Sequence, residues 1–146
     1  MLGTEFDTEN LKKLKRNAKN TQKALLSLED VLQDIKNKSR EDRDFVIYRD
    51  SAIKRFEYTI EVSRKLMAYY IEYVDKKING QKLVLKKAFE FDLIEDKIWF
   101  TMVDDRNLVT HEYSEAIAVT LLEDIFVYAK KLRVFYETID KLIENL

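Results

Sequence analysis

Apolar residues recur every three or four positions along most of this chain, which is the spacing of one face of an α-helix. The first apolar seam spans about residues 8–38 and runs through positions 11, 14, 18, 25, 28, 32 and 35, with a threonine at position 21. A second long seam runs from Phe45 to Ile78, and a polar stretch from Asn37 to Asp44 separates the two. We therefore expect two long helices that pack as an antiparallel pair.

The pattern shortens after residue 80. Apolar seams at 83–89 and 94–103 predict two short helices, and the polar segment 106–113 is expected to be a helix end followed by a loop. Ser114 is a candidate N-cap for a last long helix whose seam runs to Leu142. The expected fold is all-α, an up-and-down bundle of three long and two short helices. It forms a single domain over residues 1–146, with residues 1–7 expected to be flexible.

Composition strengthens the helical prediction. The 146 residues include no proline and two glycines, where average usage would give roughly seven and ten. Such a chain has few residues for the tight turns of β-hairpins and barrels. The absence of cysteine excludes disulfides, thiolate metal sites and cysteine nucleophiles. With one histidine and no dense acidic cluster, we expect neither a metal nor another cofactor.

Charge and hydropathy narrow the function classes. The 26 basic and 27 acidic residues nearly cancel, so no global field marks the chain as a binder of DNA or of a membrane surface. No apolar stretch approaches the roughly 20 residues that cross a bilayer. The first residues are acidic and lack the basic and apolar regions of a signal peptide. These features favour a cytoplasmic protein.

The segment from Asp104 to Tyr113 gathers the side chains best suited to chemistry. Arg106 offers a permanently charged fork for a phosphate, and His111, the only histidine, can exchange protons near neutral pH. Asn107 is placed to orient either group. The residues alone leave two interpretations open: a reactive cleft, or a helix-end arginine paired to Asp104 or Glu112 beside a histidine in solvent.

Two further polar groups are ambiguous. Asp50, Lys54 and Glu57 have helical spacing, so they form either support for the same cleft or a solvated row of ion pairs. A basic cluster near the second turn either guides an RNA backbone or is a solvated surface, and it comprises Lys76, Lys77, Lys82, Lys86 and Lys87. Trp99 and Met102 are expected to lie in the core.

Three stretches resemble the HEPN superfamily, and specifically the nucleotidyltransferase substrate-binding proteins. Residues 49–59 match the family pattern of Arg-Asp followed by Arg-Phe-Glu, and residues 83–94 are similar to its short Lys-Ala-Phe helix. Residues 99–113 match its signature W-x-x-M…D-R-N-x-x-x-H-x-Y. The last of these is the most specific of the three.

The resemblance implies a minimal nucleotidyltransferase as partner, and it implies one of two activities. In the first, the protein is the toxin of a toxin–antitoxin pair and a metal-independent endoribonuclease with its active cleft in a homodimer. Arg106 would then hold the scissile phosphate, His111 would move the proton, Asn107 would support both, and Tyr113 would accept AMP from the partner. In the alternative, the protein is a non-catalytic subunit that binds a nucleotide or substrate for the transferase. A plain helical interaction module is a third interpretation.

The histidine count bears on the first activity independently of the resemblance. Cleavage of RNA through its 2′-hydroxyl usually needs one group to remove a proton and another to deliver one. A monomer offers a single histidine for both steps, whereas a twofold dimer brings two to one seam. A ribonuclease built on this chain is therefore expected to be a homodimer.

Overall fold

The computed structural model describes residues 5–75, 84–95 and 97–146. The described residues form five helices and no strands, which confirms the all-α prediction. The helices are α1 (Glu5–Lys36), α2 (Phe45–Asp75), α3 (Val84–Glu90), α4 (Ile98–His111) and α5 (Glu115–Glu144).

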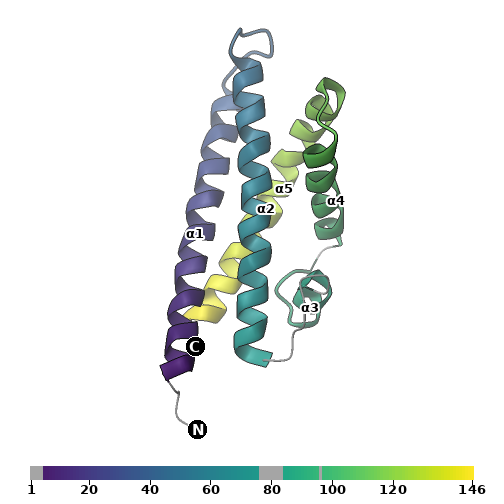
Figure 1. Ribbon diagram of the computed structural model, residues 1–146. Helices are drawn as coiled ribbons and strands as arrows, with labels where there is room; N and C mark the ends of the chain where they lie inside the picture. Colours follow the sequence, from purple (N-terminus) through teal and green to yellow (C-terminus); the bar gives the residue numbers. More distant parts are fainter. Residues whose placement is uncertain (1–4, 76–83, 96) are drawn as a thin grey trace.

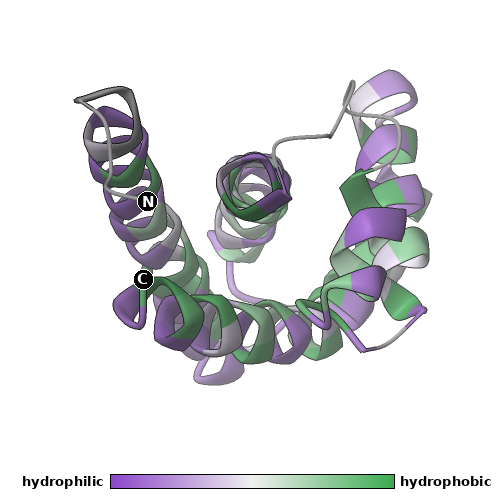
Figure 2. Ribbon diagram, turned by 90° about the horizontal axis from the view of Figure 1, so that it is seen from below, coloured by the Kyte–Doolittle hydropathy of each residue, from purple (hydrophilic) through white to green (hydrophobic). Residues whose placement is uncertain are grey.

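The three long helices form the body of the molecule. Figure 1 shows α1 and α2 side by side along most of their length, with α5 crossing behind them and α4 on the other side of α2. Viewed along α1 and α2, in Figure 2, α2 lies in the middle, between α1 and α4, and α5 runs across one side. Helix α2 therefore has two flanks, one against α1 and one against α4.

The core follows the seams expected from the sequence. Leu14, Leu25 and Leu28 of α1 are almost fully buried, as are Phe56 of α2 and Phe135 of α5. All belong to one hydrophobic cluster that draws on all five helices. Trp99 and Met102 are buried as predicted. Such burial of large apolar side chains stabilises a fold by about 1.5–3 kcal/mol per residue, so the seams determine which helix faces meet.

The ends of the short helices differ in part from the prediction. Helix α4 begins at Ile98 rather than near residue 94, and it continues through the polar segment to His111, where a loop was expected. The cap of α5 is confirmed, because the Ser114 hydroxyl accepts a hydrogen bond from the backbone N–H of Ile117 at 3.2 Å. None of the helices in the described part of the chain is long and apolar enough to cross a membrane.

Helix α3 ends without a glycine. Asp92 adopts a left-handed backbone conformation with φ of 58°. The N–H of Leu93 then donates to the carbonyl of Ala88 at 2.9 Å, and the N–H of Asp92 donates to that of Phe89 at 3.1 Å. This is the Schellman arrangement, in which glycine is the usual residue at the left-handed position. Residues 1–4 and 76–83 lie outside the described part, and with them Lys76, Lys77 and Lys82 of the basic cluster. Of the start expected to be flexible, residues 1–4 lie outside it, whereas residues 5–7 belong to α1.

Candidate functional site

Arg106 and His111 both belong to α4, which corrects the expectation that His111 lies in a loop. Arg106 is in the middle of the helix and His111 is its last residue. Five residues of an α-helix turn the side chain by about 140° around the axis, so the two residues project in different directions. Arg106 is partly buried against α2, whereas His111 is exposed. One chain therefore does not bring both side chains to a single cleft.

The Arg106 guanidinium faces the α2 flank. It lies 4.0 Å from a carboxylate oxygen of Glu61, and its Nη1 donates to Asn107 Oδ1 at 3.2 Å. The pairing with Asp104 or Glu112 that one interpretation predicted is therefore wrong. The buried Nε has no hydrogen-bond partner among the described residues. Arg106 lines a cavity of about 220 Å³ together with Glu61, Arg64, Lys65 and Val84. Three cations against one carboxylate make this cavity suitable for an anion.

Tyr113 follows α4 in the short link to α5, and 48% of it is exposed. Its hydroxyl donates a hydrogen bond to Asp50 Oδ1 on α2. Burial raises the pKa of the Tyr113 hydroxyl, and the neighbouring Asp50 carboxylate raises it further. The phenol is thus held neutral, with its proton directed at a carboxylate oxygen that can accept it.

The buried Arg49 side chain forms hydrogen bonds with Asp50 and with Glu115. It is 3% exposed, and its guanidinium donates to both carboxylate oxygens of Glu115, at 2.6 and 3.0 Å. Its Nε and Nη2 also donate to Asp50 Oδ1, both at 3.2 Å. The Arg49 guanidinium lowers the pKa of Glu115. The carboxylates of Glu115 and Asp50 raise the pKa of Arg49. The start of α5, the start of α2 and Tyr113 are thereby joined.

Sequence reasoning did not assign a role to Arg49, although a signal was present. Arg49 falls four residues after Phe45 and three before Ala52, so it occupies a position of the apolar seam of α2. A charged residue at such a position is almost never fully buried unless it is paired. The pattern therefore predicts an ion partner, although it does not say that Glu115 supplies it.

The polar stripe on α2 divides between the two flanks of the helix. Glu57 accepts a hydrogen bond from the Thr110 hydroxyl of α4 at 3.1 Å, and Asp50 contacts Tyr113 as described. The carboxylates of Asp50 and Glu57 therefore both face the carboxyl-terminal end of α4 and the residues that follow it. Lys54 instead lines a groove between α1 and α2. Of the basic cluster, Lys87 pairs with Glu90 at 3.2 Å.

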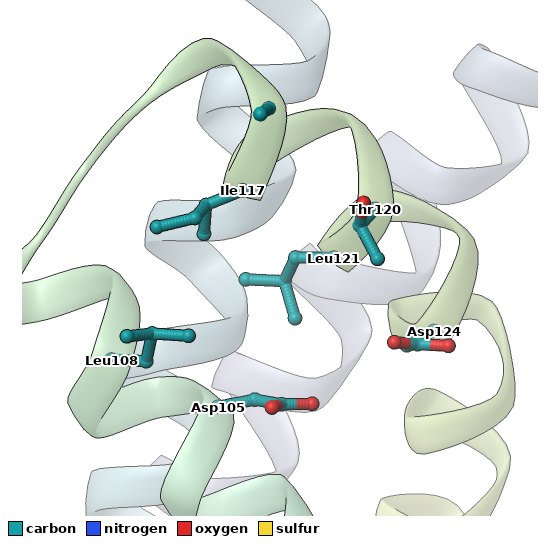
Figure 3. Close-up of a pocket in the computed structure, with 7 residues that line it drawn as sticks. Asp105, Leu108, Ile117, Thr120, Leu121 and Asp124 are labelled. Atoms are coloured by element: carbon teal, nitrogen blue, oxygen red, sulfur yellow. The ribbon is translucent and has the colours of Figure 1, made fainter.

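A second cavity lies between α4 and α5, with a volume of about 300 Å³. Figure 3 shows its apolar wall of Leu108, Ile117 and Leu121, with the carboxylates of Asp105 and Asp124 at its edge. The buried Tyr128 hydroxyl donates to Asp105. Burial raises the pKa of Asp124, and the nearby Asp105 and Glu123 raise it further. Apolar walls and two carboxylates do not suit a phosphate, so this cavity is distinct in chemistry from that of Arg106.

No group of three or more histidine, cysteine, aspartate or glutamate side chains in the described residues is arranged to hold a metal ion. The side chains that meet at the α2–α4 flank are instead cations, carboxylates and hydroxyls. They can bind an anion and exchange protons.

Comparison with known proteins supports the resemblance seen in the sequence. Residues 16–141 match the family model described as "Nucleotidyltransferase substrate binding protein like". A crystal structure of a protein from Thermus thermophilus is similar at 31% sequence identity with a TM-score of 0.64, over 79% of this chain and 94% of that one. The search of curated proteins found no match. The chain belongs to the nucleotidyltransferase substrate-binding protein-like family, a family of HEPN type.

Proposed function

We propose that this protein is the toxin-type partner of a minimal nucleotidyltransferase and a metal-independent endoribonuclease whose active cleft forms between two copies of the chain. The observation that carries the proposal is the exposed side of α4. Asn107 and His111, one helical turn apart, both lie on it and are exposed. The apolar side chains of Leu108 and Phe100, on the same helix, are also nearly half exposed. A second copy packed on this side would bring two histidines to one seam.

The reaction assigns one role to each group. One His111 accepts the proton of the ribose 2′-hydroxyl as the 2′-oxygen attacks phosphorus. The His111 of the second copy donates a proton to the departing 5′-oxygen, so the products are a 2′,3′-cyclic phosphate and a 5′-hydroxyl. The Arg106 guanidinium, whose Nη1 donates to Asn107 on the exposed side of α4, stabilises the negative charge that develops on the phosphate. Asn107 orients the guanidinium.

The direct test is cleavage of RNA by purified protein in EDTA. We expect cleavage by the wild type and a loss of at least about 100-fold in His111→Ala, because general acid–base catalysis contributes about 10²–10⁴-fold. Arg106→Ala should lose a similar factor. Arg43→Ala removes an exposed guanidinium in the turn between α1 and α2 and should cleave normally. Equal cleavage by wild type and His111→Ala, or none by either, contradicts the proposal.

Tyr113 is proposed as the residue through which the transferase regulates this activity. The phenol oxygen attacks the α-phosphorus of ATP held by the partner, the bond to pyrophosphate breaks, and the proton passes to Asp50. The support for this step is the half-exposed side chain of Tyr113 and its hydrogen bond to the Asp50 carboxylate. An AMP group at this position, two residues after His111, would block the approach of RNA to the histidine.

Mass analysis of the Tyr113 peptide after incubation with the partner and ATP tests this role. We expect one added AMP on wild type and none on Tyr113→Phe. The matched control is Tyr58→Phe, which changes another half-exposed tyrosine and should be modified like wild type. Modification of Tyr113→Phe to the wild-type extent would refute the assignment.

A second candidate is the non-catalytic binding of a nucleotide for the transferase. The observation that favours it is the cationic cavity of Arg106, Arg64 and Lys65, which is complete within one chain. Calorimetry with ATP distinguishes the candidates. If this one holds, wild type and His111→Ala bind ATP equally and Arg106→Ala binds at least about tenfold more weakly. Absence of ATP binding by the wild type rules it out.

A further inference from the structure

Residues 9–23 of α1 are strongly basic, although the whole chain is almost neutral. Six cations stand in this stretch against one carboxylate, Glu9, and they are Lys12, Lys13, Lys15, Arg16, Lys19 and Lys23. Among the described residues, only Lys12 of these six has an ion-pair partner, with its Nζ 3.6 Å from Glu9. Local charge of this kind attracts a polyanion even where the net charge of the protein does not.

A groove between α1 and α2 continues this basic surface. Its volume is about 390 Å³, and Lys23, Lys54 and Arg55 are among its lining residues. The lining residues within the described ranges include no carboxylate. Arg55 is anchored by a hydrogen bond from its Nη1 to the Ser27 carbonyl at 2.8 Å. Lys23 and Lys54 are both exposed and have no ion-pair partner among the described residues. Their charges are therefore available to a ligand.

The groove also holds an exposed aromatic ring. Tyr58 lines it and is 54% exposed. Tyr69 follows eleven residues later on α2, which places it on nearly the same side of the helix about 16 Å away. The Nζ of Lys13 lies 4.5 Å from the centre of the Tyr69 ring. Lysines therefore lie close to tyrosine rings at two places along the contact between α1 and α2.

We propose that single-stranded RNA binds along this α1–α2 groove, with phosphates on Lys23 and Lys54 and a base stacked on Tyr58. Proteins that bind single strands combine a positive groove with aromatic platforms in this way. An acidic protein segment would use the same cations but has no need of the exposed ring. The groove is separate from the Arg106 cavity, which lies on the other flank of α2. Its use in RNA cleavage rests on the proposed function, but the binding does not require cleavage.

The test measures binding of a short fluorescent single-stranded RNA by anisotropy, in a His111→Ala background that leaves the RNA uncut. The groove variant Lys23→Gln/Lys54→Gln should bind at least about tenfold more weakly, and the slope of log affinity against log salt should fall by about 1.4, since each single-strand phosphate contact contributes about 0.7. Tyr58→Leu should weaken binding by about fivefold to a hundredfold with little change in slope.

The matched control is Lys130→Gln/Lys141→Gln, which removes two exposed charges from α5. It should bind RNA like the parent protein. The proposal is overturned if the control loses as much affinity as the groove variant, if the parent protein does not bind RNA, or if the groove variant loses only its affinity for the nucleotidyltransferase. RNA binding through the groove without cleavage by wild type would refute the ribonuclease and keep the groove. Cleavage by wild type with unaltered RNA binding by the groove variants would refute the groove and keep the ribonuclease.

Discussion

At the residue scale, the buried guanidinium of Arg49 determines how Tyr113 is presented. It donates to Glu115 at the start of α5 and to Asp50, and Asp50 in turn accepts a hydrogen bond from the Tyr113 hydroxyl. Hydrogen bonds to charged partners contribute about 1.5–3 kcal/mol each when well formed. Arg49 is therefore a structural residue, and its loss should lower the stability of the fold and disturb the position of Tyr113.

Arg49→Ala should lower the free energy of unfolding by about 2–3 kcal/mol, because it removes these charged hydrogen bonds and leaves a cavity. Arg49→Met, which restores most of the volume, should cost less. Chemical denaturation measures both, with Arg43→Ala as the exposed control, expected within about 0.5 kcal/mol of wild type. An Arg49→Ala protein as stable as this control would contradict the role given to the pair.

The same pair predicts a pH dependence. The Arg49 guanidinium lowers the pKa of Glu115 in the folded state, so the unfolded chain binds this proton more readily. The contribution to stability is then present above the unfolded pKa of about 4.3 and is lost as pH falls through the lower folded value. Wild type should exceed Glu115→Gln in stability at neutral pH, and the difference should close in acid. A difference that grows as pH falls would show the opposite sign.

At the element scale, the end of α3 shows how a chain with two glycines makes its turns. Asp92 takes the left-handed position that glycine usually fills. Asp92→Gly should therefore stabilise the fold by about 0.5 kcal/mol, which is the relief of backbone strain less the greater freedom of the unfolded glycine. Asp92→Ala should destabilise it by a similar amount. Thermal unfolding of the two variants measures this, and stabilisation by alanine would contradict the explanation.

The long helices could be predicted from the sequence because their apolar seams are regular, and the seam residues Leu14, Leu28 and Phe135 are buried as expected. The extent of α4 could not, because its polar surface was interpreted as a loop. One signal was available, since Val109 follows Met102 at helical spacing and is buried. A helix needs an apolar residue only on its inner side, so polar residues between 104 and 111 did not have to end it.

The sequence could predict only those residues of the candidate site that lie close together in the chain. Arg106, His111 and Tyr113 stand close together in the chain, so a sequence motif identifies them. The contacts of Tyr113 with Asp50 and of Arg49 with Glu115 join residues more than sixty positions apart. They depend on how α2 packs against α4 and α5, which spacing along the chain does not determine.

At the scale of the whole molecule, α2 separates two surfaces of different chemistry. The groove on its α1 flank holds Lys23 and Lys54, which have no ion-pair partner in the described part of the chain, and an exposed tyrosine. Its α4 flank carries the carboxylates that contact Thr110, Arg106 and Tyr113. The proposed assignment is RNA binding on the first flank and regulation by AMP on the second. The proposed cleavage also requires a second copy of the chain, because Arg106 and His111 diverge on α4 of a single chain.

The central claim is that two copies of the chain form the active cleft, and the most direct measurement follows specific RNA-cleaving activity in EDTA across a dilution series. Analytical ultracentrifugation of the same samples gives the fraction of dimer. We predict that activity per chain falls in proportion to the dimer fraction, because each cleft needs the histidines of two chains. A monomer that retains full cleavage activity would contradict the account.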